Sequence, residues 1–102
     1  KMIKDEDDRD FARKLMKVAL NSWDETEKKI GSMLDNWDLD RISLLDKIIL
    51  IAAISELENF PLTPGRVIIN EYIEISKVFS TDRSNIFING ILDKYTKNIN
   101  RN

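Results

Sequence analysis

The sequence predicts an all-α fold, a compact bundle of about five helices, and three observations support this class. Apolar residues recur at three- and four-residue steps rather than at alternate positions, which is the period of an α-helix. Only 3 Gly and 2 Pro interrupt the 102 residues. This length accommodates one domain, and a hydrophobic content of 42% argues against disorder.

The first two helices are predicted at residues 8–21 and 24–34. The apolar residues of the first form one stripe: Phe11, Leu15 and Val18. The stripe of the second is thinner: Ile30, Met33 and Leu34. Trp23 and Trp37 flank this second helix, and we expect both to cover the core.

The third helix, residues 43–59, is apolar on nearly every face between Ile48 and Ile54. A helix that is apolar all round belongs in the centre of a domain. We expect only its ends to reach water, through four charged residues: Asp46, Lys47, Glu56 and Glu58.

Thr63 and Pro64 open a fourth helix that reaches about residue 79, because Thr is a good N-cap and Pro suits the first helical position. Ser80 or Thr81 caps a fifth helix that runs toward Ile99. The stripe of this last helix is Ile88, Ile91, Leu92, Tyr95 and Ile99.

The composition argues against several function classes. With no Cys and no His, the chain lacks thiol chemistry, disulfides and the commonest general base and metal ligand. Glu56 and Glu58 stand two residues apart and so face different sides of a helix. We therefore expect no catalytic residue, no metal, no cofactor and no enzyme activity.

The longest apolar run is far shorter than the roughly 20 residues of a membrane span, and no signal peptide is visible, so we expect a cytoplasmic protein.

The charge is unevenly distributed along the chain. Residues 1–59 contain 10 basic and 14 acidic residues, whereas residues 60–102 contain 6 basic and 4 acidic ones. A net charge of −2 predicts no strong non-specific binding to nucleic acid, but it leaves room for a local basic patch in the second half.

Asn89 and Gly90 lie in the middle of the fifth predicted helix. Gly in a helix costs about 1 kcal/mol relative to Ala, so a compensating contact is expected. The prediction is that another helix approaches closely at Gly90, and that Asn89 caps or bridges a neighbouring backbone group.

Residues 66–94, RVIINEYIEISKVFSTDRSNIFINGILDK, resemble the end of the NusB family of bacterial transcription antitermination factors. The matching residues are Ile69, Asn70, Glu71, Glu74, Lys77 and Phe79, followed by Phe87, Ile88, Asn89, Gly90, Ile91, Leu92 and Asp93. The strong match covers residues 41–94, and residues 1–40 match only as helices of suitable length. Asn70 and Glu71 are expected to serve a structural network.

The resemblance implies a NusB-like all-helical fold in two halves, the first of which begins with an arginine-rich segment. No such segment is present here, the acidic DEDDRD stands near the start, and the chain begins with Lys. We therefore expect residues 1–102 to form a single NusB-like C-terminal helical domain, a fragment of a longer protein.

The resemblance further implies binding of boxA-type RNA and of the ribosomal protein NusE, within the RNA polymerase antitermination complex that supports ribosomal RNA synthesis. The expected RNA contacts are Lys77, Arg83, Phe87 and Lys94. A helix N-terminus favours an anion, and an aromatic ring can stack on an unpaired base. The family uses the matching phenylalanine against RNA, but it often has an acidic or small residue where Arg83 stands. Asp82 opposes RNA by its charge.

Asp46 and Lys47 are the expected contacts for NusE, because the family presents an acidic residue at the start of the central helix. An acid in a first helical turn is also favoured by the helix dipole alone. Two other readings remain open: the NusB-like RNA-binding domain of a ribosomal RNA cytosine methyltransferase, and a helical protein-interaction domain without an RNA role. The oligomeric state and the preferred RNA sequence remain open as well.

Overall fold

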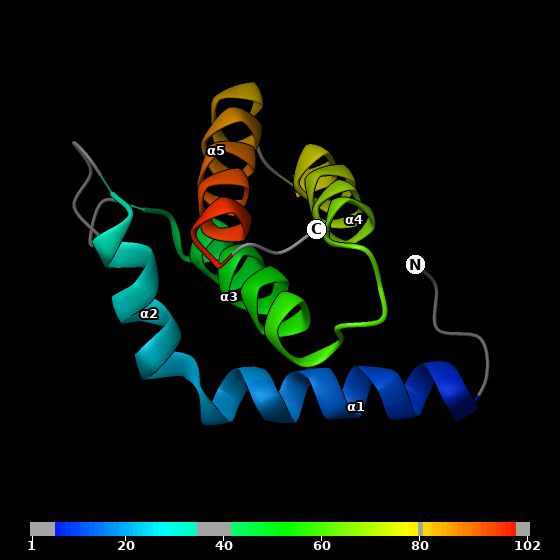
Figure 1. Cartoon of the computed structure of the whole chain (residues 1–102). Helices are drawn as coiled ribbons and strands as arrows, with labels where there is room; N and C mark the ends of the chain where they lie inside the picture. Colours follow the sequence, from blue (N-terminus) through cyan, green and yellow to red (C-terminus); the bar gives the residue numbers. More distant parts are fainter. Residues whose placement is uncertain (1–5, 35–41, 80, 100–102) are drawn as a thin grey trace.

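The structure is a computed structural model that describes residues 6–34, 42–79 and 81–99 (Figure 1). These residues form five helices: α1 (Glu6–Asn21), α2 (Trp23–Ser32), α3 (Leu44–Asn59), α4 (Gly65–Phe79) and α5 (Asp82–Asn98). The described part of the chain contains no strand. The all-α prediction is confirmed, and the predicted helix ends are correct to within about two residues. Trp37 lies outside the described residues.

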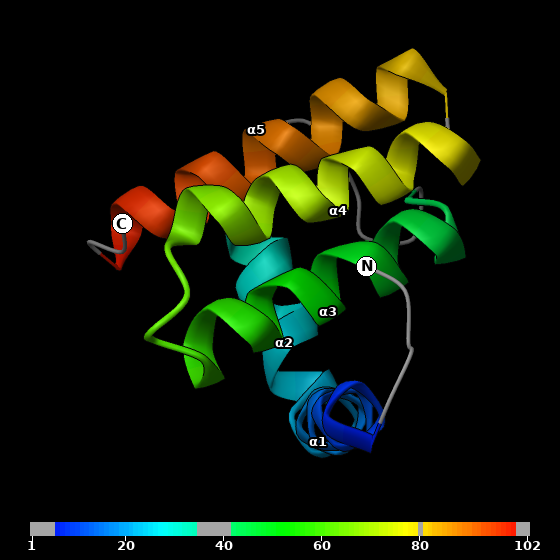
Figure 2. The ribbon, with the colours of Figure 1, turned by 90° about the vertical axis from the view of Figure 1, so that its right-hand side faces the viewer.

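Helix α3 is the centre of the domain and packs against each of the other four helices. Three of its side chains, Leu50, Ile51 and Ile54, are fully buried. Figure 2 looks along α1, which crosses below α3, while α4 and α5 lie side by side above it. The sequence pattern thus identified the central helix correctly.

The water-facing residues of α3 differ from the prediction. Asp46 and Glu56 were expected in water, yet they are only 7% and 2% exposed. Leu44 and Ile48 are instead 66% and 42% exposed. The two carboxylates can be buried because hydroxyl groups from other helices donate to them.

Side-chain caps fix the starts of α3 and α5. The Ser43 hydroxyl accepts a hydrogen bond of 3.1 Å from the backbone N–H of Asp46. The Thr81 hydroxyl accepts one of 3.2 Å from the backbone N–H of Ser84. Each cap satisfies a backbone donor that has no partner within its helix. The cap at Thr81 is one of the two predicted for α5, whereas the cap at Ser43 was not predicted.

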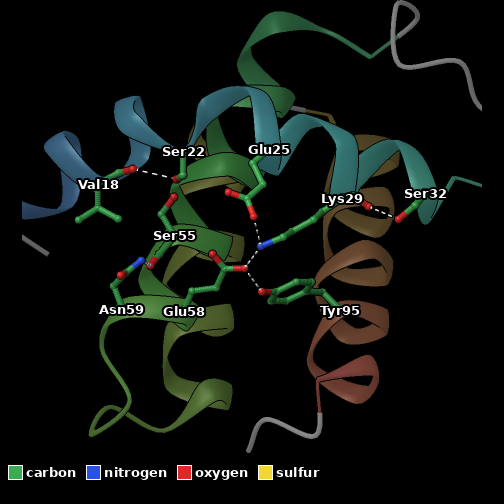
Figure 3. Close-up of polar contacts among 9 residues, drawn as sticks. All are labelled: Val18, Ser22, Glu25, Lys29, Ser32, Ser55, Glu58, Asn59 and Tyr95. Carbon is green, nitrogen blue, oxygen red and sulfur yellow. Dashed lines mark hydrogen bonds and ion pairs between the residues drawn. The ribbon is translucent and has the colours of Figure 1, made fainter.

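A polar cluster joins α2, α3 and α5 (Figure 3). The ammonium of Lys29 lies 2.6 Å from the Glu58 carboxylate and 3.9 Å from that of Glu25. The Tyr95 hydroxyl donates to the same Glu58 carboxylate. Burial of Tyr95, together with this hydrogen bond, raises the pKa of its phenol well above the ordinary value. The cluster thus ties the last helix to the first half of the chain.

Candidate functional site

A small surface pocket lies where the first turns of α3 and α5 meet, with a volume of about 260 Å³. We call it the α5 corner, and it is lined by Ile42, Ser43, Asp46, Thr81, Arg83, Ser84 and Phe87. Two of the predicted RNA contacts, Arg83 and Phe87, therefore share one pocket. The two sides of the pocket come from segments almost forty positions apart in the chain.

Arg83 and Phe87 are placed together by the helix itself. They are four residues apart, so they occupy the same face of α5 one turn from each other. Arg83 is exposed in the first turn, just after the Thr81 cap. Phe87 is half-buried and packs against the hydrophobic core. The corner thus combines a cation, a partly exposed ring and a helix N-terminus.

Asp46 links α3 to α5 at the α5 corner. Its carboxylate accepts a hydrogen bond of 2.9 Å from the Ser84 hydroxyl on α5. Lys47, its neighbour, forms an ion pair of 3.0 Å with Glu27 on α2. Both side chains named as contacts for a protein partner therefore hold helices together. Little of the Asp46 side chain is left for a direct contact with another molecule.

Lys77 and Lys94, the other two predicted RNA contacts, do not line the α5 corner. Lys77 is exposed on α4 and lies 3.1 Å from the Glu74 carboxylate. The Lys94 ammonium donates to the backbone carbonyl of Met33 at 3.1 Å, near the end of α2. Lys94 is also about two helical turns beyond Phe87, so the two side chains are separated along the axis of α5. The Lys94 side chain thus links α5 to the end of α2.

The predicted close approach at Gly90 is wrong. A Cβ atom added there would meet no other described residue within 4 Å. Gly90 and Asn89 are both exposed, because the turn of α5 points Ile88, Ile91 and Leu92 into the core. Packing within the described part of the chain gives no reason for this Asn-Gly pair.

Asn70 and Glu71, which were both expected to serve a structural network, lie in different surroundings. Asn70 is exposed, whereas Glu71 is half-buried next to Tyr72. The Tyr72 hydroxyl donates to the Glu56 carboxylate at 2.9 Å. Burial first, and then the charges of Glu56 and Glu71, raise the pKa of the Tyr72 phenol well above its ordinary value.

A larger apolar groove between α1, α3 and α4 was not anticipated from the sequence. Its volume is about 480 Å³, and it is lined by Asp8, Phe11, Ala12, Leu15, Met16, Ala19, Leu20, Trp23, Ile48, Ile51, Ala52, Glu56, Glu71, Tyr72 and Ile75. One signal was present: Met16 and Leu20 widen the apolar stripe of α1 beyond what one neighbouring helix covers. Trp23 contacts the core, as expected of a lid, and also lines this groove.

The described residues form an all-α domain in which four helices pack around α3. A sequence profile described as the NusB family matches residues 1–97. The chain belongs to the NusB family. The described helices include none long and apolar enough to cross a membrane.

Several relatives carry the name transcription antitermination protein NusB. That of Salinibacter ruber is 40% identical over 83% of this chain and 53% of its own length. That of Methylacidiphilum infernorum is 39% identical over 95% of this chain and 68% of its own length. The solved structure of T. maritima NusB superimposes with a TM-score of 0.86 at 33% identity, covering 91% of this chain and 66% of that one. The chain thus spans about half to two thirds of the length of these relatives.

Proposed function

We propose that this chain is a domain of a transcription antitermination factor that binds boxA-type RNA together with the ribosomal protein NusE. In this role it supports processive transcription of ribosomal RNA by the cytoplasmic RNA polymerase. Membership of the NusB family supports the general role. The observation that carries the RNA contact is the α5 corner, where Arg83 and Phe87 line one pocket beside a helix N-terminus.

The α5 corner offers separate contacts for the two parts of a nucleotide. The exposed N–H groups in the first turn of α5 and the Arg83 guanidinium attract a phosphate. The ring of Phe87 can stack on an unpaired base. Asp82 opposes the phosphate by its charge. With so few cations in reach, the affinity should fall only gently as salt rises.

The contact with NusE is proposed at the start of α3, next to the α5 corner. Asp46 and Lys47 would act there by holding the surface in shape, through their bonds to Ser84 and Glu27. Leu44 beside them is largely exposed and can supply the apolar contact area. RNA and protein partner would then occupy adjoining surfaces.

The test is a titration of fluorescently labelled boxA-type RNA with the chain, with and without NusE, using variants of the α5 corner. Phe87→Leu keeps an apolar side chain against the core but removes the stacking ring, which is typically worth about 1–3 kcal/mol per base. Arg83→Glu reverses the cation. Both variants should weaken binding, whereas Lys97→Glu, an exposed charge reversal near the end of α5, should change it little.

Two results would contradict the proposal. One is the absence of RNA binding both with and without NusE. The other is binding that Phe87→Leu and Arg83→Glu reduce no more than Lys97→Glu does, because the corner would then have no special role. Circular dichroism of each variant shows whether the helices are intact.

A further inference from the structure

Helix α5 is packed unevenly along its length. Only one of its buried residues, Ile88, precedes Gly90. The others all follow it: Ile91, Leu92, Tyr95 and Thr96. Two side chains beyond Gly90 also bond to distant parts of the chain, since Lys94 donates to the Met33 carbonyl and Tyr95 to the Glu58 carboxylate. The second half of α5 is therefore the firmly held one.

The first half of α5, residues 82–90, buries less apolar surface. Ile86 is 75% exposed, and Phe87 is only half-buried. Two side-chain contacts join this half to its neighbours: the Ser84 hydroxyl donates to the Asp46 carboxylate at 2.9 Å, and the Asn85 amide oxygen lies 2.5 Å from the Ser76 hydroxyl. Local unfolding is easiest where few apolar contacts are lost. We therefore expect the first half to open before the second.

Asn89 and Gly90 lie at the boundary between the two halves. Both are exposed, and a Cβ added to Gly90 would meet no described residue within 4 Å. Glycine is the most conformationally permissive residue, so the backbone turns most easily at this position once the helix opens. The boundary thus places a side-chain amide directly before an unhindered backbone nitrogen, in contact with solvent.

These two groups are the reactants of an intramolecular ring closure. The backbone nitrogen of Gly90 bonds to Cγ of Asn89, the bond from Cγ to the amide nitrogen breaks, and ammonia leaves with the proton that the Gly90 nitrogen gives up. Water then opens the succinimide ring at either carbonyl, which yields an aspartyl or an isoaspartyl residue at position 89. The reaction consumes only water, and the absence of a side chain on Gly90 removes the main obstacle to it.

The intact helix prevents this reaction. Within an α-helix each backbone N–H donates to the carbonyl four residues earlier, and Gly90 lies well inside α5. Its nitrogen is therefore engaged in the helix. Ring closure also requires the ψ angle of Asn89 to leave the helical value of about −42°. Exposure alone is thus insufficient, and the helix has to open at Asn89 first.

We propose that Asn89 is a deamidation site that α5 keeps inactive and that reacts when the first half of the helix opens. The product carries a negative charge where the amide of Asn89 was neutral. The isoaspartyl form also adds a methylene to the backbone, so the regular hydrogen-bond pattern of the helix is interrupted there. The modification therefore records, in a covalent form, that this part of α5 has opened.

The experiment incubates the full 102-residue chain at mildly alkaline pH and follows deamidation at each Asn by peptide mass spectrometry, with chromatography to separate the aspartyl and isoaspartyl products. Asn70, which is also exposed in a helix but precedes Glu71, is the internal control. We expect Asn89 to react faster than Asn70, and Gly90→Ala to suppress the reaction at Asn89. In denaturing urea Asn89 should react much faster than in the folded chain.

The role of helix opening is tested at the N-cap of α5. Thr81→Ala removes the cap and should speed deamidation of Asn89 about fivefold, the factor that corresponds to the loss of about 1 kcal/mol of helix stability. Thr81→Asp retains a capping side chain and is the matched control, with a rate close to that of the unchanged protein. In denaturing urea both variants and the unchanged protein should react at one rate.

Three results would overturn the proposal. Asn89 could react no faster than Asn70 even in urea, which would remove the site. Equal rates at Asn89 with and without urea would show that the helix gives no protection. Equal rates for Thr81→Ala and Thr81→Asp in the folded chain would show that the first half of α5 does not control the reaction. None of these measurements involves RNA, so the result is separate from the test of the α5 corner.

Discussion

The angle of Gly90 around the axis of α5 decides whether this residue faces the core or solvent. A glycine within a helix predicted that another helix approaches closely. The apolar stripe of α5, however, faces the core, and Gly90 is not part of that stripe. Successive residues are about 100° apart, so Gly90 points well away from Ile88 and Ile91, which face the core. The apolar stripe of α5 therefore predicts the exposure of Gly90 better than the glycine itself does.

Gly90→Ala should increase the free energy of unfolding by up to about 1 kcal/mol, the difference in helix propensity, because the new Cβ meets open space. Urea unfolding followed by circular dichroism measures this. Gly31→Ala is a useful companion: its Cβ also meets nothing within 4 Å, but it lies near the end of α2 and should gain less. A loss of stability on Gly90→Ala would instead restore the close-contact explanation.

At the scale of the elements, helix positions were predictable because their causes are local. The caps at Ser43 and Thr81 and the spacing of apolar residues all lie within a few positions of the helix they define. The burial of Asp46 and Glu56 was not predictable in the same way. Their partners, Ser84 and Tyr72, come from other helices, and only the assembled fold brings them close.

The caps provide a prediction at this scale. Ser43→Ala and Thr81→Ala should each lower the free energy of unfolding by about 1 kcal/mol, because each leaves a backbone N–H of a first turn without its partner. Ser43→Asp and Thr81→Asp should retain most of the stability, since Asp also caps well. Thermal unfolding monitored by circular dichroism measures these differences. Equal losses for the Ala and Asp variants would contradict a capping role.

At the scale of the whole molecule, the candidate site was predicted in part. Arg83 and Phe87 are close in sequence on one helix, so their shared surface followed from helical spacing. Lys77 and Lys94 did not join them, because Glu74 and the Met33 carbonyl bind these ammonium groups elsewhere. The groove was missed because it depends on how three helices are placed around each other, which periodicity does not reveal.

The stability of the whole domain should fall at alkaline pH. The phenol pKa values of Tyr72 and Tyr95 are raised above 10.0, so the unfolded state loses these protons first as pH rises. Their contribution to stability is present below pH 10 and declines above it. Each tyrosine should lower the free energy of unfolding by up to about 1.4 kcal/mol per pH unit in that range.

Urea unfolding between pH 9 and 11 tests this on the protein and on Tyr72→Phe and Tyr95→Phe. Each Phe variant is expected to be less stable at neutral pH, because a carboxylate loses a donor, but its stability should decline less steeply above pH 10. Lysine titration is common to all three proteins and cancels in the comparison. Parallel pH curves would show that neither phenol is coupled to folding.

The open surroundings of Gly90 also have a practical consequence. The chain contains no Cys, so a single Gly90→Cys substitution would create one thiol for attaching a spectroscopic label. A dye there would project into solvent from the outer side of α5, where an added Cβ has space. Energy transfer from this position would then report distances to labelled RNA.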